Sequence, residues 1–240
     1  MKNRSTRRDV LTAGIVGAAA VVAHPKSLAQ DAKPPVAAAP AVAAPQGAAP
    51  YAARNYEGLV GMPGFNEALL RNHFKLYEGY VKNLNSALTE LDLLGKAGKA
   101  GSATAAELRR RLGWEFNGMR LHELYFENLG GKDVLRAESK LGMELAKQFG
   151  SIEAWLADFK AVGGMRGIGW AALVRDGWSN RLYNVWINEH EGGHFGACPI
   201  LLIMDVFEHA FLVDNTSKKA DYIDAFFKNV NWAAAESRFG

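Results

Sequence analysis

The chain has 240 residues, 49% of them hydrophobic and 22% charged, which is ordinary for a globular protein of one or two domains and excludes a fibrous or wholly disordered chain. Its formal net charge is only +3, and without a basic stripe this gives no reason to expect nucleic acid as a partner. A single cysteine, Cys198, excludes an intramolecular disulfide and a cysteine-rich zinc site.

Residues 1–29 have the pattern of an export signal. Thr6-Arg7-Arg8-Asp9-Val10-Leu11 leads into an uncharged stretch of Ala, Gly and Val that ends at Ala23, and Ser27-Leu28-Ala29 has the small-x-Ala form of a cleavage site. The stretch is shorter than the about 20 apolar residues of a spanning helix. It resembles a twin-arginine signal peptide, which implies export of a folded protein to the periplasm and no stable membrane span after cleavage. An uncleaved signal anchor is the alternative.

Residues 30–55 are rich in Ala and Pro and carry few large side chains. Such a segment buries too little surface to offset the entropy of ordering it. We therefore predict a disordered linker over 30–55, with the folded part beginning at Tyr56.

Residues 56–129 predict a helical-hairpin domain. Apolar residues recur with helical spacing over 65–94 and over 104–129, and a Gly- and Ala-rich turn separates the two stretches. Asn66 is a suitable N-cap for the first helix.

Residues 130–240 predict an α+β domain with a small antiparallel three-stranded sheet flanked by helices. Two strands flank a hairpin turn at Asp176-Gly177, and a continuous apolar run predicts a third, buried strand. The expected helices are 137–149, 151–162, one from about Val206, 218–228 and 232–238, and the expected strands are 170–175, 181–187 and 199–204.

Four side chains form a candidate metal site. Asp205 and His209 are four residues apart where a buried strand gives way to a helix, and His73 and His122 lie on the apolar faces of the two long helices. Taken alone, Asp205 could instead cap the helix and His209 be a core residue. A mixed set of imidazoles and a carboxylate suits one iron or manganese ion with a bound water. Aromatic residues would keep that ion dry: Phe116, Tyr125, Phe126, Trp170 and Phe207.

Most of the chain from Phe65 to Phe239 resembles the iron/manganese superoxide dismutases. The segments that carry the resemblance are Tyr80–Asn85, Phe116–Gly118, Gly167–Ala171, Asp205–Ala210, Ala220–Tyr222 and Asn229–Trp232. The resemblance implies one Fe or Mn ion held by His73, His122, Asp205 and His209, alternating between +2 and +3 while superoxide becomes oxygen and peroxide. It also implies that Tyr80, at the mouth of the site, and Glu208 are catalytic residues. In the family, the residue corresponding to Glu208 reaches a metal-binding histidine of the partner subunit in a homodimer.

The chain departs from the family pattern near the first ligand. His73 and Tyr80 are seven positions apart, one fewer than is usual in the family, so an ungapped match would place Asn72 at the ligand position. We prefer His73, because asparagine is a much poorer ligand. The usual gateway pair of histidine and tyrosine is replaced by Tyr77 and Phe211.

The residue that orients the metal-bound water also differs. Gly118 has no side chain for this role. His190 resembles a histidine found at the corresponding place in some family members, and His194 is the second candidate.

Two other functions fit parts of the sequence. His190-Glu191-Gly192-Gly193-His194 matches the HExxH pattern of zinc peptidases, although that pattern requires a helix and each of its two glycines costs about 1 kcal/mol there. The altered gateway also allows a dismutase-fold metal-binding protein without fast turnover.

Overall fold

The computed structural model describes residues 50–212 and 218–240. The predicted signal peptide over 1–29 and residues 30–49 of the predicted linker lie outside the described residues. A short 3₁₀ helix over Glu57–Leu59 precedes the other elements, which are α1 (Glu67–Lys96), α2 (Ala103–Glu127), α3 (Lys140–Phe149), α4 (Ile152–Gly164), β1 (Gly169–Arg175), β2 (Leu182–Asn188), β3 (Ile200–Asp205), α5 (Glu208–Phe211), α6 (Lys219–Lys228) and α7 (Trp232–Phe239).

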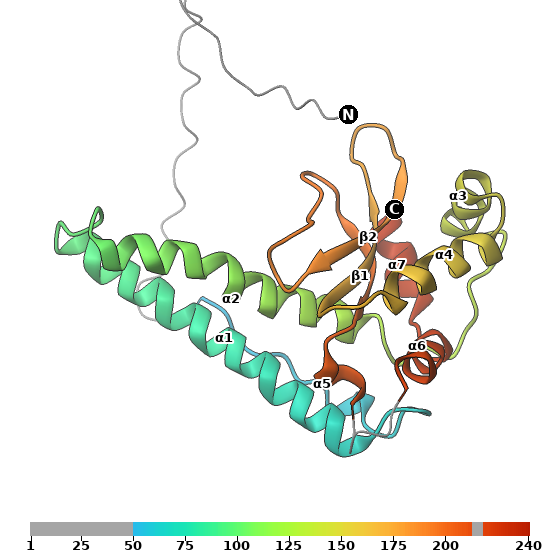
Figure 1. Ribbon diagram of the computed structural model, residues 1–240, viewed down its shortest axis with the longest axis horizontal. Coiled ribbons are helices and arrows are strands. Elements are labelled where there is room, and N and C mark those ends of the chain that lie inside the picture. The colour runs from blue at the N-terminus through green and yellow to red at the C-terminus, as the bar shows by residue number, and fades with distance from the viewer. Residues whose placement is uncertain (1–49, 213–217) are drawn as a thin grey trace, which may run out of the picture. The chain divides into compact units, whose positions relative to one another are not determined.

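Helices α1 and α2 form the predicted antiparallel hairpin; they lie close together at the turn that connects them and diverge toward their other ends (Figure 1). The Asn66 side chain caps α1 by accepting a hydrogen bond from the backbone N–H of Leu69, and Ser102 caps α2 in the same way. The predicted helical hairpin and the Asn66 cap are therefore confirmed.

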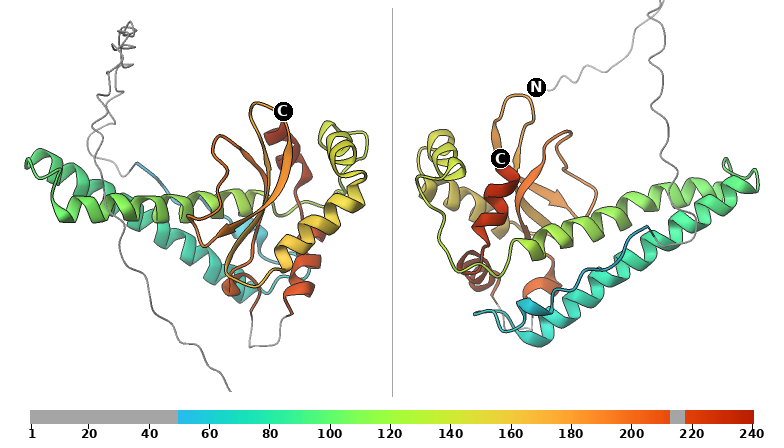
Figure 2. Two further views of the ribbon diagram at one scale, coloured as in Figure 1. Left: turned by 45° about the horizontal axis from the view of Figure 1, so that its top comes forward. Right: turned by 180° about the vertical axis from the view of Figure 1, so that it is seen from behind.

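The sheet has the order β2-β1-β3, and both pairs are antiparallel. Helix α4 packs on β1 and β2, whereas α2 and α7 pack on β3 (Figure 2). Gly163 of α4 lies against Met204 and Ala171. Because side chains alternate along a strand, the neighbouring Trp170 and Asp205 face the opposite side, toward α2. The predicted α+β fold with a three-stranded antiparallel sheet is confirmed, while the division of the folded part at 129/130 stays a prediction.

The hairpin between β1 and β2 is longer than the predicted turn at Asp176-Gly177. Its strands end at Arg175 and resume at Leu182. The Asp176 side chain accepts a hydrogen bond from the N–H of Trp178 at 3.0 Å, and Asn180, with φ 58°, is the loop residue in the left-handed region. Asp and Asn tolerate these conformations, so Gly177 is not the residue that reverses the chain.

Residues 51–55, predicted to be disordered linker, instead lie against the helical hairpin. Tyr51 and Asn85 exchange two hydrogen bonds, of 3.2 and 2.8 Å, and the N–H of Arg54 donates to the Tyr77 hydroxyl at 3.0 Å. We call Tyr51–Tyr56 the N-terminal strap. The prediction was wrong here because these contacts are tertiary and the composition of the segment does not encode them.

Among the described residues, none of the helices combines the length and the apolar character needed to cross a bilayer.

Candidate metal centre

The four predicted metal ligands come together from four elements. His73 extends from α1, His122 from α2, Asp205 from the end of β3 and His209 from α5. One ligand atom from each lies within 4.8 Å of the others. His73, His122 and Asp205 are buried, and His209 is partly exposed. This is the one group of three or more potential ligands found in the described part of the chain.

Asp205 lies at the centre of the cluster. Its Oδ2 is 3.0 Å from His73 Nε2 and 3.2 Å from His209 Nε2, while Oδ1 accepts from the N–H of Phe207 at 2.8 Å. Burial alone would raise the pKa of Asp205, but the charges and hydrogen bonds of His209 and His73 outweigh it and hold the pKa well below its usual value. The carboxylate is therefore ionised and available to a cation.

His122 shows why a cation fits this cluster. Its Nδ1 lies 2.5 Å from the carbonyl oxygen of Gly118; since a carbonyl can only accept, Nδ1 carries the proton and Nε2 has a lone pair. This Nε2 is buried, lacks a hydrogen-bond partner among the described residues and lies 3.7 Å from Asp205 Oδ2. Two electron-rich atoms face each other across a dry gap, an arrangement that a positive ion between them stabilises.

Two of the three histidines, His73 and His122, are suited to bind metal as neutral ligands. Burial lowers the pKa of His73, and it lowers the pKa of His122 further because His73 is nearby. Burial would also lower the pKa of His209, but the Asp205 carboxylate raises it above its ordinary value. Imidazole nitrogens and one carboxylate form a donor set that suits iron or manganese.

Aromatic rings surround the cluster on several sides. His73 packs against Tyr125 and Phe126, with ring centroids 5.4 and 5.0 Å away. The other neighbours are Trp170, at 5.0 Å from His122, and Phe207, at 5.1 Å from His209. Phe116 does not belong to this shell: its ring packs on Tyr51 and is 37% exposed, so this part of the expectation was wrong.

A hydrogen-bonded chain runs beside the ligands. The indole N–H of Trp170 donates to His190 Nδ1 at 3.2 Å, and His190 Nε2 lies 2.8 Å from the Tyr80 hydroxyl. Because indole can only donate, the proton of a neutral His190 is on Nε2 and points at the Tyr80 oxygen. Burial lowers the pKa of His190 to about 4, so this neutral form prevails at pH 7. Tyr80 also stacks on His122 at 5.3 Å.

Gly118 is small because Tyr80 occupies its side-chain space. A Cβ atom at this position would lie 2.4 Å from the Tyr80 ring, a distance that real carbon contacts do not reach. Gly118, which has no side chain to orient a bound water, is therefore the surface against which the Tyr80 ring packs.

The alternative residues do not reach the cluster. Asn72 is exposed on α1, next to the buried His73. His194 is exposed, and its Nε2 lies 2.9 Å from the backbone oxygen of His190. Residues 189–193 form turns and a single bridge rather than a helix, so the HExxH match lacks the helical geometry of a zinc peptidase site.

Glu208 begins α5 and is exposed in the single chain. Its predicted place in a dimer stays a prediction. Phe211 is half-buried against Tyr222, with 5.7 Å between ring centroids.

Two residues near the site were not singled out from the sequence. The hydroxyl of Tyr222 lies 2.6 Å from the backbone oxygen of Asp205, and the ring of Trp114 lies 4.9 Å from that of His190. Tyr222 falls in one of the segments that carry the family resemblance, which was the available signal. Nothing in the local pattern around Trp114 indicates its contact.

A helical hairpin joined to a three-stranded sheet, with three histidines and one aspartate that converge where they meet, defines a protein with a mononuclear site for a redox metal. Residues 137–238 match the family model of the iron/manganese superoxide dismutases, C-terminal domain. The chain is 37% identical over 186 residues to a superoxide dismutase [Fe] of Cupriavidus metallidurans, covering 74% of this chain and 90% of that protein. It is 34% identical over 178 residues to superoxide dismutase [Mn] 2 of Haloferax volcanii, covering 74% and 88% of the two chains. The chain belongs to the iron/manganese superoxide dismutase family.

Proposed function

We propose that this chain is a superoxide dismutase that uses one iron or manganese ion, held by His73, His122, Asp205 and His209. The observation that carries the proposal is the buried cluster, in which an ionised carboxylate and the unpartnered Nε2 of His122 face one another. The metal held by these four residues would supply a one-electron couple between +2 and +3 for the oxidation of one superoxide and the reduction of the next.

The residues of the chain supply the dry surroundings and the protons. Reduction of superoxide to hydrogen peroxide consumes two protons per peroxide formed. Burial, with Glu115 and Asp205 nearby, raises the pKa of Tyr80 to about 12, so this hydroxyl keeps its proton at neutral pH. Because His190 donates to the Tyr80 oxygen, the proton of Tyr80 is left for an acceptor in the site.

The test is superoxide dismutation by the purified protein, with metal analysis of the same sample and reconstitution with iron or manganese. We expect activity in proportion to the content of one of these metals. Fully loaded protein without activity would contradict the proposal and leave a metal-binding protein of the dismutase fold. Binding of zinc alone would contradict the choice of metal.

We further propose that the protein works as a homodimer in which Glu208 reaches the metal site of the partner subunit. Its exposed place at the start of α5, one residue before His209, supports this. Sedimentation of wild type and Glu208→Ala should show a dimer that the substitution weakens. A wild-type protein that sediments as a monomer would contradict the proposed homodimer.

We also propose export to the periplasm through the twin-arginine route. The support is the sequence of residues 1–29 with Arg7-Arg8. A fusion of residues 1–29 to a reporter should be exported and cleaved, and Arg7→Lys with Arg8→Lys should retain it in the cytoplasm. Export that is unaffected by the double substitution would contradict this route.

A further inference from the structure

Tyr77 occupies a position where the family has a gateway residue, but it points into the protein. It is fully buried. Its hydroxyl donates to Glu123 Oε1 at 2.9 Å and accepts from the N–H of Arg54 at 3.0 Å. Tyr77 therefore joins α1, α2 and the N-terminal strap at one point.

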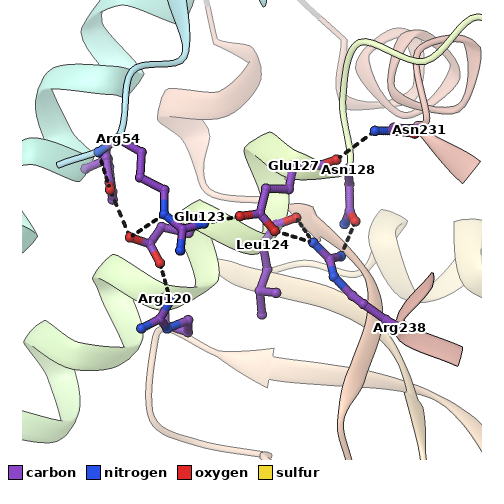
Figure 3. A network of polar contacts seen from close by, with 9 residues as sticks. Arg54, Arg120, Glu123, Leu124, Glu127, Asn128, Asn231 and Arg238 are labelled. Atoms are coloured by element: carbon purple, nitrogen blue, oxygen red, sulfur yellow. Dashed lines mark hydrogen bonds and ion pairs between the residues drawn. The ribbon is translucent and has the colours of Figure 1, made fainter. Parts of the chain in front are cut away.

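Glu123 is a buried carboxylate at the centre of a charge network (Figure 3). It is only 4% exposed. Arg120 Nη1 lies 2.5 Å from its Oε2, and Arg54 Nε lies 3.8 Å from its Oε1. A buried carboxylate is tolerated only when charges and hydrogen bonds compensate it, and removing one of them is costly. The position of Glu123 is thus fixed by partners from two segments in addition to its own helix.

This network lies directly behind two metal ligands. Tyr77 follows His73 by one helical turn on α1, and Glu123 is the residue after His122 on α2. The hydrogen bond between Tyr77 and Glu123 therefore ties together the two helix segments that present His73 and His122.

A layer of aromatic rings makes the same connection. Phe126 packs against His73 at 5.0 Å and against His122 at 5.9 Å. It also packs against Tyr56 of the strap at 4.7 Å and against Tyr77 at 6.0 Å. The strap thus supports the ring on which both histidines lie.

We propose that Tyr77 and Glu123 are positioning residues of the metal centre, and that the N-terminal strap holds them in place. They keep the spacing of His73 and His122 and thereby slow the release of the metal. The proposal rests on the metal centre named under the proposed function, but not on its catalytic activity. Partners that orient metal ligands typically change metal affinity by about 10- to 100-fold when they are replaced.

The chain offers matched controls. Glu144 of α3 accepts hydrogen bonds from Lys147 at 3.1 Å and from Gln148 at 2.7 Å, so Glu144→Gln removes a hydrogen-bonded carboxylate on a helix that carries no metal ligand. Trp155 of α4 is buried, and its indole N–H donates a hydrogen bond to Asn184 Oδ1 at 3.0 Å. Trp155→Phe therefore removes one aromatic hydrogen-bond donor, as Tyr77→Phe does.

The experiment measures the rate at which manganese(II) passes from loaded full-length protein to a chelator, at a temperature at which circular dichroism shows every variant folded. We expect Tyr77→Phe and Glu123→Gln to release the metal about 10-fold faster than wild type or more, and Glu144→Gln and Trp155→Phe to stay near the wild-type rate. In the double variant the two effects should be less than multiplicative, because Tyr77→Phe removes the hydrogen bond that Glu123→Gln weakens.

Equal release rates for the test and control variants would overturn the proposal. So would multiplicative effects in the double variant. Release is measured without superoxide, so a protein that binds manganese but lacks dismutase activity would refute the proposed function and leave this inference standing. Altered activity with unchanged release would refute only the inference.

Discussion

Trp170 and Asp205 lie directly opposite each other in the ladder between β1 and β3. From this pair, the indole of Trp170 reaches His190 at 3.2 Å, and the carboxylate of Asp205 reaches His73 at 3.0 Å. The backbone register of β1 and β3 therefore places the hydrogen-bonded chain from Trp170 to Tyr80 beside the ligand cluster. A slip of one residue would turn one of these side chains to the other face of the sheet.

Replacement of the first ligand separates His73 from its neighbour Asn72. We expect His73→Ala to abolish stoichiometric metal binding, because the substitution leaves only three of the four ligands and opens a cavity in place of the fourth. Asn72→Ala should bind metal as the wild type does, because Asn72 is exposed. Metal content after purification and dialysis is the measurement. Metal loss with Asn72→Ala and not with His73→Ala would show that the ligand is wrongly assigned.

Replacement of His190 tests the chain from Trp170 to Tyr80. We expect His190→Ala to keep the metal and to lower dismutation by about 10-fold or more, since Trp170 and Tyr80 both lose a partner. His194→Ala serves as the control and should leave activity unchanged, because its side chain is exposed. The reverse pattern would identify His194 as the active residue.

Replacement of Gly118 tests the surface against which the Tyr80 ring packs. We expect Gly118→Ala to lower the free energy of unfolding by about 1–3 kcal/mol and to reduce activity, because the new methyl group must displace the Tyr80 ring. Gly95→Ala, near the end of α1, meets no atom within 4 Å and should stabilise the helix by up to about 1 kcal/mol. Urea denaturation curves measure both. A neutral effect of Gly118→Ala would mean that Tyr80 is not held against this residue.

The stability of the protein should depend on pH through His190. Its pKa is about 4 in the folded chain and about 6.5 in an unfolded one, so between these values the unfolded state binds a proton that the folded state does not. Stability therefore falls as the pH drops through this window, by at most about 1.4 kcal/mol per pH unit from this residue.

The control for this dependence is His190→Gln, because glutamine keeps a donor and an acceptor but does not titrate. Both proteins are loaded with metal, and their free energies of unfolding are compared. As the pH falls from about 6.5 to 4, the wild type should lose stability relative to the variant. If the difference in unfolding free energy stays constant between about pH 6.5 and 4, His190 is not the residue that takes up the proton on unfolding.

The sequence predicted the parts of the fold that depend on local pattern. Helical spacing and the Asn66 cap set the hairpin, and apolar runs set the three strands. The ligand types also stood out, because His73 and His122 are polar residues on apolar helix faces. In each case the signal lies within a few neighbouring residues.

The features that escaped prediction depend on partners far away in the sequence. The strap is ordered by side chains of α1, such as Asn85 and Tyr77, which its own Ala-rich composition does not reveal. Helical periodicity shows that Tyr77 is buried but not that it meets Glu123. Likewise, the reversal at Asn180 depends on the whole loop after Asp176.

The long sequence separation within the ligand cluster has a consequence for biosynthesis. His73 and Asp205 are 132 residues apart, and they meet only after the hairpin and the sheet have formed. A growing chain presents the two helical histidines first and completes the carboxylate end of the cluster much later, as domains fold in the order of their synthesis. The complete set of four ligands therefore exists only after β3 and α5 have been synthesised.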